Sequence, residues 1–171
     1  STIDFQTRSG RLSARHDAKG GNGAAMTIRL DFPAEPAEAC VPATGVLEAL
    51  GNVSFRFFGR NRMDYLVEFE NEAQVRSLRP DFAKLRDVCG TARGAIVTAK
   101  SARSDYDFVS RYFAPAFGID EDPVTGSAHC CLAPFWSAKL GKERMTGYQA
   151  SKRGGTVRLR VAGDRVILGG A

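Results

Sequence analysis

The sequence has no long hydrophobic run and no recognisable export signal. Charged or polar side chains interrupt every apolar stretch before it reaches the roughly 18 consecutive apolar residues that a membrane helix needs. The first eight residues have neither the basic start nor the apolar middle of a signal peptide. We therefore expect a cytoplasmic location and no membrane partner. These residues also lack an initiator Met and resemble the inside of a strand, so we expect an N-terminal segment of the same protein to be missing.

Cysteine and histidine are sparse. The four cysteines include no CxxC pair, and the two histidines supply no cluster of further ligands. Adjacent residues such as Cys130 and Cys131 rarely form a disulfide with each other, so free thiols in a reducing compartment are expected. This pattern argues against a zinc site, and we expect no bound metal.

Acidic residues are scarce only near the C-terminus. From Gly141 onward there are seven basic and two acidic residues, which accounts for the whole net charge of +5. Residues 157–161 alternate apolar with charged side chains, so Arg158 and Arg160 should share one face of a half-buried strand. No interleaved aromatic residues or recognition helix accompany them. We interpret this face as solvent-exposed and expect no nucleic-acid partner.

What remains is typical of a globular domain. The 171 residues are 43% hydrophobic and 25% charged, and a chain of this length buries roughly 70% of its unfolded surface. Strand patterns outnumber helix patterns, which predicts an α+β fold with a mostly antiparallel sheet wrapped on one apolar helix. Strands are expected at 3–7, 12–15, 25–32, 52–59, 63–69, 95–99, 106–113, 145–152, 156–161 and 165–168, with a turn at Ser9-Gly10. Helices are expected at 43–50, 72–78, 82–88 and 127–140, and residues 33–42 form a proline-spaced connector.

The segment that carries chemistry runs from Phe113 to Cys131. Three successive acids lead into Thr125-Gly126-Ser127, where the nearly all-apolar helix begins. An apolar helix is a buried one, and its first N–H groups lack intrahelical partners and carry partial positive charge. Gly126 lets a ligand approach the backbone, and the Ser127 or Thr125 hydroxyl can cap or donate. The helix start therefore predicts a cradle for a carboxylate or phosphate.

Asp122 lies directly before this cradle. An anion beside an anion site makes sense if the ligand carries both signs, with its carboxylate on the Gly126 and Ser127 amides and an amino group or transferable proton facing Asp122. This argues for an amino-acid-like ligand. The alternative, that Asp122 or Thr125 merely caps the helix and contributes about 1 kcal/mol, stays open.

Three further side chains in the segment are weaker candidates. His129 lies within one turn of the cradle, where it could move protons, or it could be a satisfied core histidine. Cys130 or Cys131 could have a lowered thiol pKa and act as base or nucleophile, or both could be inert buried thiols.

At these residues the sequence resembles a known family. The run Asp120-Glu121-Asp122-Pro123-Val124-Thr125-Gly126-Ser127-Ala128-His129-Cys130, preceded by Ser110-Arg111-Tyr112-Phe113-Ala114-Pro115, looks like the hallmark of the PhzF-like family of phenazine biosynthesis, which shares the diaminopimelate epimerase fold. Segments 5–10, 30–34, 64–67 and 149–155 support the resemblance, so it spans nearly the whole chain.

The resemblance implies a fold of two similar domains, each a curved sheet around a central helix, with the active site between them. Residues 1–36 would be the closing strands of an incomplete first domain and residues 37–171 the second domain. The strand that carries the family's catalytic glutamate would be missing, so this chain alone is expected to be inactive. Strands 1–36 without their helix should expose an apolar surface, which predicts a separate N-terminal fragment or self-association as a homodimer.

For the site, the resemblance implies that Asp122 positions the substrate or exchanges protons with it, while Gly126 and Ser127, with Thr125, hold its carboxylate. Arg153 and Gly154 are secondary candidates because they lie in a matching segment. The family's best-known activity isomerises a dihydro-hydroxyanthranilate without metal or organic cofactor. The expected function is thus a cofactor-independent isomerase or epimerase-like enzyme for a small carboxylated, amino-bearing metabolite. The alternative is a non-catalytic metabolite-binding or protein-interaction module that retains the cleft.

Overall fold

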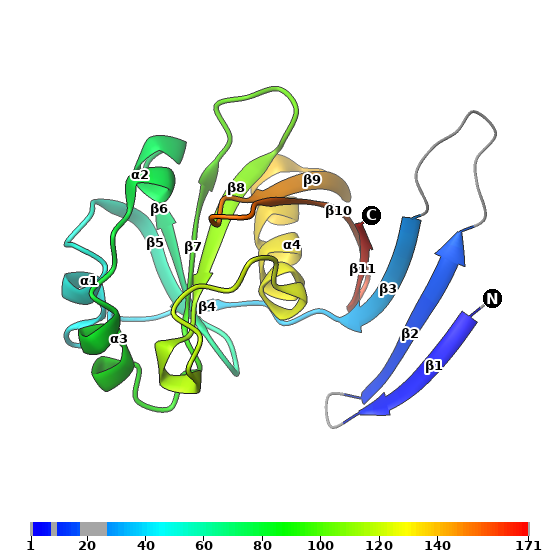
Figure 1. Ribbon diagram of the computed structural model, residues 1–171. Coiled ribbons are helices and arrows are strands. Elements are labelled where there is room, and N and C mark those ends of the chain that lie inside the picture. The colour runs from blue at the N-terminus through cyan, green and yellow to red at the C-terminus, as the bar shows by residue number, and fades with distance from the viewer. Residues whose placement is uncertain (1, 8–9, 18–26, 171) are drawn as a thin grey trace.

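The computed structural model describes residues 2–7, 10–17 and 27–170, and within these ranges eleven strands form one sheet (Figure 1). Their order across the sheet is β1-β2-β3-β11-β10-β9-β8-β7-β6-β5-β4. The strands are β1 Thr2–Thr7, β2 Gly10–Asp17, β3 Thr27–Pro33, β4 Glu38–Ala39, β5 Phe55–Arg60, β6 Tyr65–Phe69, β7 Ala95–Lys100, β8 Phe108–Phe113, β9 Arg144–Gln149, β10 Gly155–Ala162 and β11 Arg165–Gly170. Neighbours are antiparallel except for the parallel pairs β6–β7 and β8–β9. The fold is α+β with one large mixed sheet.

Helices lie in both parallel connections. Helices α2 (Glu72–Ser77) and α3 (Phe82–Val88) connect β6 to β7, whereas the 3-10 helix η1 (Pro115–Phe117) and α4 (Gly126–Leu140) connect β8 to β9. Parallel strands cannot be joined by a tight turn, so each pair requires a crossover of this kind. The sequence predicted mostly antiparallel pairing, which is confirmed, but it did not predict these two crossovers. No helix of the described residues is long and apolar enough to cross a membrane.

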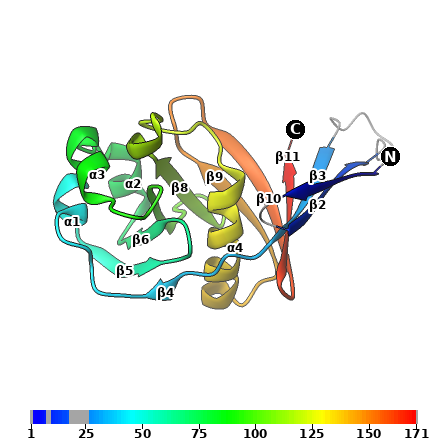
Figure 2. The ribbon, with the colours of Figure 1, turned by 90° about the horizontal axis from the view of Figure 1, so that it is seen from below.

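The middle strands are buried on both faces. Every residue of β6 and β8 is buried, as are the first five of β7. Successive side chains of a strand point to opposite faces, so each strand contributes to two hydrophobic clusters. One cluster contains residues of α1 (Val46–Ala49), α2 and α3, and the other contains residues of α4. Figure 2 shows α1, α2 and α3 lying together, apart from α4.

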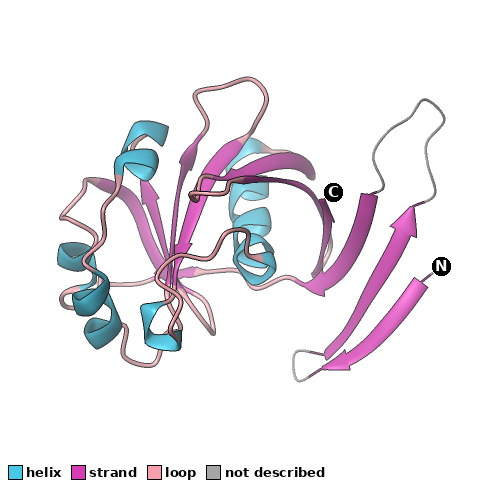
Figure 3. Cartoon of the chain, viewed as in Figure 1, coloured by secondary structure: helices cyan, strands magenta, loops and turns pink. Residues whose placement is uncertain are grey.

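Helix α4 lies in the centre of the second cluster, with strands β8 to β11 curving around it (Figure 3). Its side chains are buried from Ala128 to Ala133, and Trp136 Nε1 donates a hydrogen bond to Thr98 Oγ1 at 3.0 Å. The helix ends at Gly141, whose φ of 64° is the left-handed conformation common after a helix. The predicted apolar helix is therefore confirmed, and it begins one residue earlier than predicted.

The expected helix at 43–50 is shorter in the structure. Only Val46–Ala49 is helical, because Gly45 has a φ of 84° and so cannot belong to the helix. The connector at 33–42 contains the two-residue strand β4, which pairs with β5.

Strands β1, β2 and β3 form the end of the sheet that lies beyond α4 (Figures 1 and 2). They join the rest of the sheet through the antiparallel β3–β11 pair. Ile3, Phe5 and Ile28 on these strands are 58%, 49% and 51% exposed, so the expected exposed apolar side chains are present. The expected Ser9-Gly10 turn lies partly outside the described residues. The domain boundary after residue 36 stays a prediction.

Candidate functional site

The start of α4 presents unpaired backbone donors. The first intrahelical bond runs from His129 N to Thr125 O at 3.3 Å, and the N–H groups of Gly126, Ser127 and Ala128 have no acceptor among the described residues. Gly126 is exposed, and a Cβ built on it would come no closer than 3.9 Å to the Leu168 side chain. The backbone of the helix start is therefore open to a ligand, and its N–H groups suit an anion.

Asp122 is held by its main chain, and its carboxylate is partly exposed. Its N–H donates to Tyr112 O at 3.1 Å. Its Oδ2 accepts a hydrogen bond from Thr125 Oγ1. Thr125 occupies the N-cap position without a side-chain cap bond, and no helix N–H among the described residues donates to Asp122. The structure therefore does not support the capping alternative.

Gln149 from β9 holds this loop by hydrogen bonds to Asp122 and Thr125. The sequence analysis did not assign it a role. Its side chain is fully buried. Its Oε1 accepts from Thr125 N at 2.8 Å, while its Nε2 donates to Asp122 O at 2.7 Å and to Thr125 Oγ1 at 3.1 Å. One buried amide thus fixes both residues that flank the bend into α4.

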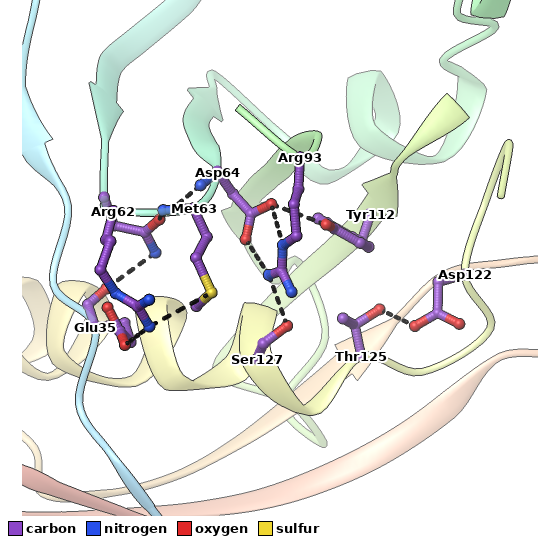
Figure 4. Close-up of polar contacts among 10 residues, drawn as sticks. Glu35, Arg62, Met63, Asp64, Arg93, Tyr112, Asp122, Thr125 and Ser127 are labelled. Carbon is purple, nitrogen blue, oxygen red and sulfur yellow. Dashed lines mark hydrogen bonds and ion pairs between the residues drawn. The ribbon is translucent and has the colours of Figure 1, made fainter. Parts of the chain in front are cut away.

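A second polar network reaches the helix start from the other side (Figure 4). The Asp64 carboxylate, 0% exposed, pairs with Arg93 Nη2 at 2.7 Å and accepts from Tyr112 Oη at 2.8 Å. Arg93 Nη2 also donates to Ser127 Oγ at 3.1 Å. Burial, and then the charge of Asp64, raise the pKa of Tyr112, which keeps its hydroxyl protonated as a donor.

The sequence analysis missed Asp64, Arg93 and Tyr112 as site residues. Asp64 and Tyr112 lie in segments that support the family resemblance, but nothing in their local pattern indicates a contact with Ser127. Arg93 is separated from Ser127 by 34 positions, and only the fold brings the two side chains together.

His129 is a buried core histidine. It is 0% exposed, and its Nδ1 lies 2.7 Å from Thr125 O. A carbonyl oxygen only accepts, so Nδ1 carries the proton and Nε2 is unprotonated, without a partner among the described residues. Burial lowers the pKa of His129 to about 4. The side chain thus supports the Thr125 carbonyl, and its burial argues against the proton-moving interpretation.

Of the two interpretations of Cys130 and Cys131, the inert buried thiol is confirmed and the activated thiol is wrong. Both side chains are buried in the apolar cluster around α4, and burial raises the pKa of each thiol to about 12. This shift is opposite to the one that a nucleophile needs, because the thiolate is the reactive form.

The turn between β9 and β10 touches the loop through Ser151. Its Oγ donates to Pro123 O at 2.7 Å and accepts from Gly154 N at 3.1 Å. Gly154 has a φ of 71°, and a Cβ there would lie 2.2 Å from the Tyr148 hydroxyl, so another residue would be strained and Tyr148 would have to shift. Arg153 is exposed in this turn, and no contact within the described residues joins it to Asp122 or Ser127. Its candidate role stays a prediction.

Together these contacts place a carboxylate, a hydroxyl and open backbone N–H groups on one loop and helix start. The set can bind an anion and exchange a proton beside it. In the described part of the chain, no group of three or more His, Cys, Asp or Glu residues is arranged to hold a metal ion.

The chain resembles known proteins both in sequence and in structure. The chain is 46% identical to an uncharacterized isomerase of Halalkalibacterium halodurans, over 97% of this chain and 59% of that protein. It is 45% identical to an uncharacterized isomerase of Pseudomonas aeruginosa, over 98% of this chain and 60% of that protein. The crystal structure of a phenazine biosynthesis protein of the PhzF family from Enterococcus faecalis superimposes with a TM-score of 0.84 and 35% identity, covering 99% of this chain and 61% of that chain.

The chain spans less than two thirds of the length of each of these relatives. The similarity nevertheless extends over nearly every residue that the chain contains. The family model for phenazine biosynthesis-like protein matches residues 1–170. The chain therefore belongs to the phenazine biosynthesis-like protein family, PhzC-PhzF.

Proposed function

We propose that the chain forms one wall of the active site of a cofactor-independent isomerase, which acts by acid/base proton transfer on a small carboxylated, amino-bearing metabolite. In this proposal residues 37–171 are a diaminopimelate epimerase-like domain with α4 as its central helix, and Asp122, Gly126 and Ser127 are its substrate contacts. The isomerase names of the two curated relatives support the reaction class.

The observation that carries the proposal is that a carboxylate and a set of open backbone N–H donors lie at one bend of the chain. Gln149 holds the Asp122 main chain and the Thr125 N–H, so the Asp122 carboxylate has a defined place beside the open N–H groups of α4. Figure 4 shows Asp122 and Ser127 on either side of Thr125. A ligand that spans the two positions needs a carboxylate at one end and a proton donor at the other.

The proposed chemistry follows from this placement. The ligand carboxylate accepts hydrogen bonds from the Gly126 and Ser127 N–H groups. Removal of a proton from the carbon beside that carboxylate moves negative charge onto its oxygens, and oriented N–H donors stabilise this charge without reorganising. Asp122 faces the amino group or accepts and returns a proton.

The opposite wall of the cleft would carry a second proton-transferring group. The relatives are longer than this chain, so we propose that the additional sequence supplies this group. Turnover is accordingly a property that we propose for the longer protein, and ligand binding at α4 is the property to test on this chain.

Binding can be tested by ¹⁵N NMR titration of the 171-residue chain. Anthranilate carries an amino group and a carboxylate, benzoate only the carboxylate, and aniline only the amine. We expect anthranilate to shift the Gly126 and Ser127 amide resonances, benzoate to do so more weakly, and aniline to leave them unchanged. Equal shifts from all three compounds, or none, would contradict a carboxylate site.

Asp122→Ala separates catalysis from stability. We expect the variant of this chain to lose the preference for anthranilate over benzoate. In the longer protein, the same substitution should abolish exchange with D₂O of the substrate proton on the carbon beside the carboxylate. The melting temperature should stay near that of the wild type, because Asp122 makes no helix cap. Asp120→Ala is the matched control, since Asp120 is an exposed acid of the same loop. A variant that melts early and still exchanges protons would refute the catalytic assignment, and binding without exchange would favour a non-catalytic module.

A further inference from the structure

We propose that Arg93 is a positioning residue for the ligand carboxylate, acting through the Ser127 hydroxyl. Arg93 orients this hydroxyl so that its proton points toward the open start of α4 and forms a third donor beside the two backbone N–H groups. The inference rests on the proposed function, because it assigns a role within the same carboxylate site.

The direction of one hydrogen bond leads to this role. Arg93 Nη2 lies 3.1 Å from Ser127 Oγ. A guanidinium has only donors, so the serine oxygen is the acceptor and its own proton must point elsewhere. Within the described residues Ser127 Oγ has no other hydrogen-bond partner. The hydroxyl proton therefore remains available to an incoming anion.

Arg93 can fix the hydroxyl because it is itself held firmly. Its guanidinium contacts both oxygens of Asp64, through Nη2 at 2.7 Å and Nε at 3.4 Å. The backbone N–H of Arg93 donates to Met63 O at 2.7 Å. Asp64 in turn accepts from Tyr112 Oη at 2.8 Å and is 0% exposed. A buried carboxylate with these partners has one favourable arrangement, and Arg93, at 32% exposure, reaches from it toward the surface.

The same pairing decides how Arg93 acts. Asp64 offsets the charge of the guanidinium at short range, so attraction of an anion by an unpaired positive charge is not the main effect. The contact to Ser127 is the one connection from this network to the helix start within the described residues. We therefore expect the contribution of Arg93 to affinity to depend on the presence of the Ser127 hydroxyl.

A double-mutant cycle measures this dependence. The dissociation constant for anthranilate is determined by NMR for the wild type, Ser127→Ala, Arg93→Met and the double variant. A hydrogen bond to a charged group contributes about tenfold or more to affinity, so each single variant should bind about tenfold more weakly. The double variant should bind no more weakly than Ser127→Ala alone.

Arg165→Met is the matched control. Arg165 is 30% exposed, close to the 32% of Arg93, and pairs with Asp31 at 2.8 Å. Its replacement therefore also removes an arginine–carboxylate ion pair, but a more exposed one, whose contacts within the described residues do not include Ser127. We expect this variant to bind anthranilate as the wild type does. If the role of Arg93 were purely structural, Arg93→Met would lower the melting temperature but would leave the effect of Ser127→Ala on affinity unchanged.

Arg93→Met leaves the Asp64 carboxylate buried without its cation and can prevent folding. Asp64→Asn combined with Arg93→Met removes both charges and keeps an acceptor for Tyr112. In that background Ser127→Ala should change the affinity less than twofold. If Ser127→Ala weakens anthranilate binding as much in the Arg93→Met or the Asp64→Asn/Arg93→Met background as it does in the wild type, the assignment of Arg93 is overturned. The carboxylate site itself would remain intact. Failure of the wild-type chain to bind anthranilate would overturn the site and the assignment together.

Discussion

Gln149→Leu tests whether one buried amide holds the loop that precedes α4. The substitution keeps the approximate volume of the side chain but removes its three hydrogen bonds to Thr125 N, Thr125 Oγ1 and Asp122 O. Thr125 is only 8% exposed, so its N–H would be left buried without a partner, which costs about 1–3 kcal/mol. The lost bond to the partly exposed Asp122 carbonyl adds about 0.5–1.5 kcal/mol. We expect the free energy of unfolding to fall by about 2–4 kcal/mol.

Urea denaturation followed by fluorescence measures this loss, and the ¹⁵N spectrum reports the position of the loop. Gln74→Leu is the control, because the Gln74 side chain makes one exposed capping contact, in which its Oε1 accepts from Asn71 N at 3.1 Å. It should lower stability by about 1 kcal/mol or less. A Gln149→Leu protein that loses less than about 1 kcal/mol and keeps the wild-type Asp122 and Thr125 resonances would refute the argument, since the loop would then be held by other contacts.

Three further predictions concern the surroundings of the site. Gly154→Ala should destabilise the chain by at least about 1 kcal/mol more than Gly163→Ala does, because both glycines have positive φ (71° and 62°) but only the Gly154 Cβ would meet the Tyr148 hydroxyl. Burial lowers the pKa of His129 from about 6.5 in the unfolded chain to about 4 in the folded chain. Between these two pH values the unfolded chain binds a proton more readily, so the free energy of unfolding falls as the pH drops through this window. Urea titrations should show about 3 kcal/mol less acid destabilisation in His129→Asn than in the wild type. Phe5→Lys should reduce any concentration-dependent self-association in analytical ultracentrifugation, because Phe5 is an exposed apolar side chain of β1.

Each of these predictions has a result that contradicts it. Equal destabilisation by the two glycine variants would mean that backbone strain alone matters and that Tyr148 yields to the added methyl group. An unchanged pH dependence in His129→Asn would mean that other groups account for acid unfolding. Association of Phe5→Lys at the wild-type concentration would mean that the apolar face of β1 is not the contact surface.

The sequence by itself determined the elements whose periodicity is strong. The apolar run after Thr125 predicted α4 within one residue of its start, because a helix without a polar face must be buried. The alternation at 157–161 placed Arg158 and Arg160 on the exposed face of β10, where they are found. The acidic loop and glycine-opened helix start indicated Asp122, Gly126 and Ser127, since those properties are local to the chain.

Only the tertiary structure decided which distant side chains support that loop. Gln149 lies 24 positions after Thr125, and Arg93 and Asp64 lie 34 and 63 positions before Ser127, so no local pattern links them. Their contacts depend on the parallel pairing of β8 with β9 and of β6 with β7, which sequence periodicity does not encode. The thiols of Cys130 and Cys131 show the same limit, because the sequence left open whether they are activated or inert, and only the packing around α4 showed them buried with a raised pKa. Local periodicity determines which residues are buried, whereas sheet order and register determine which of them meet.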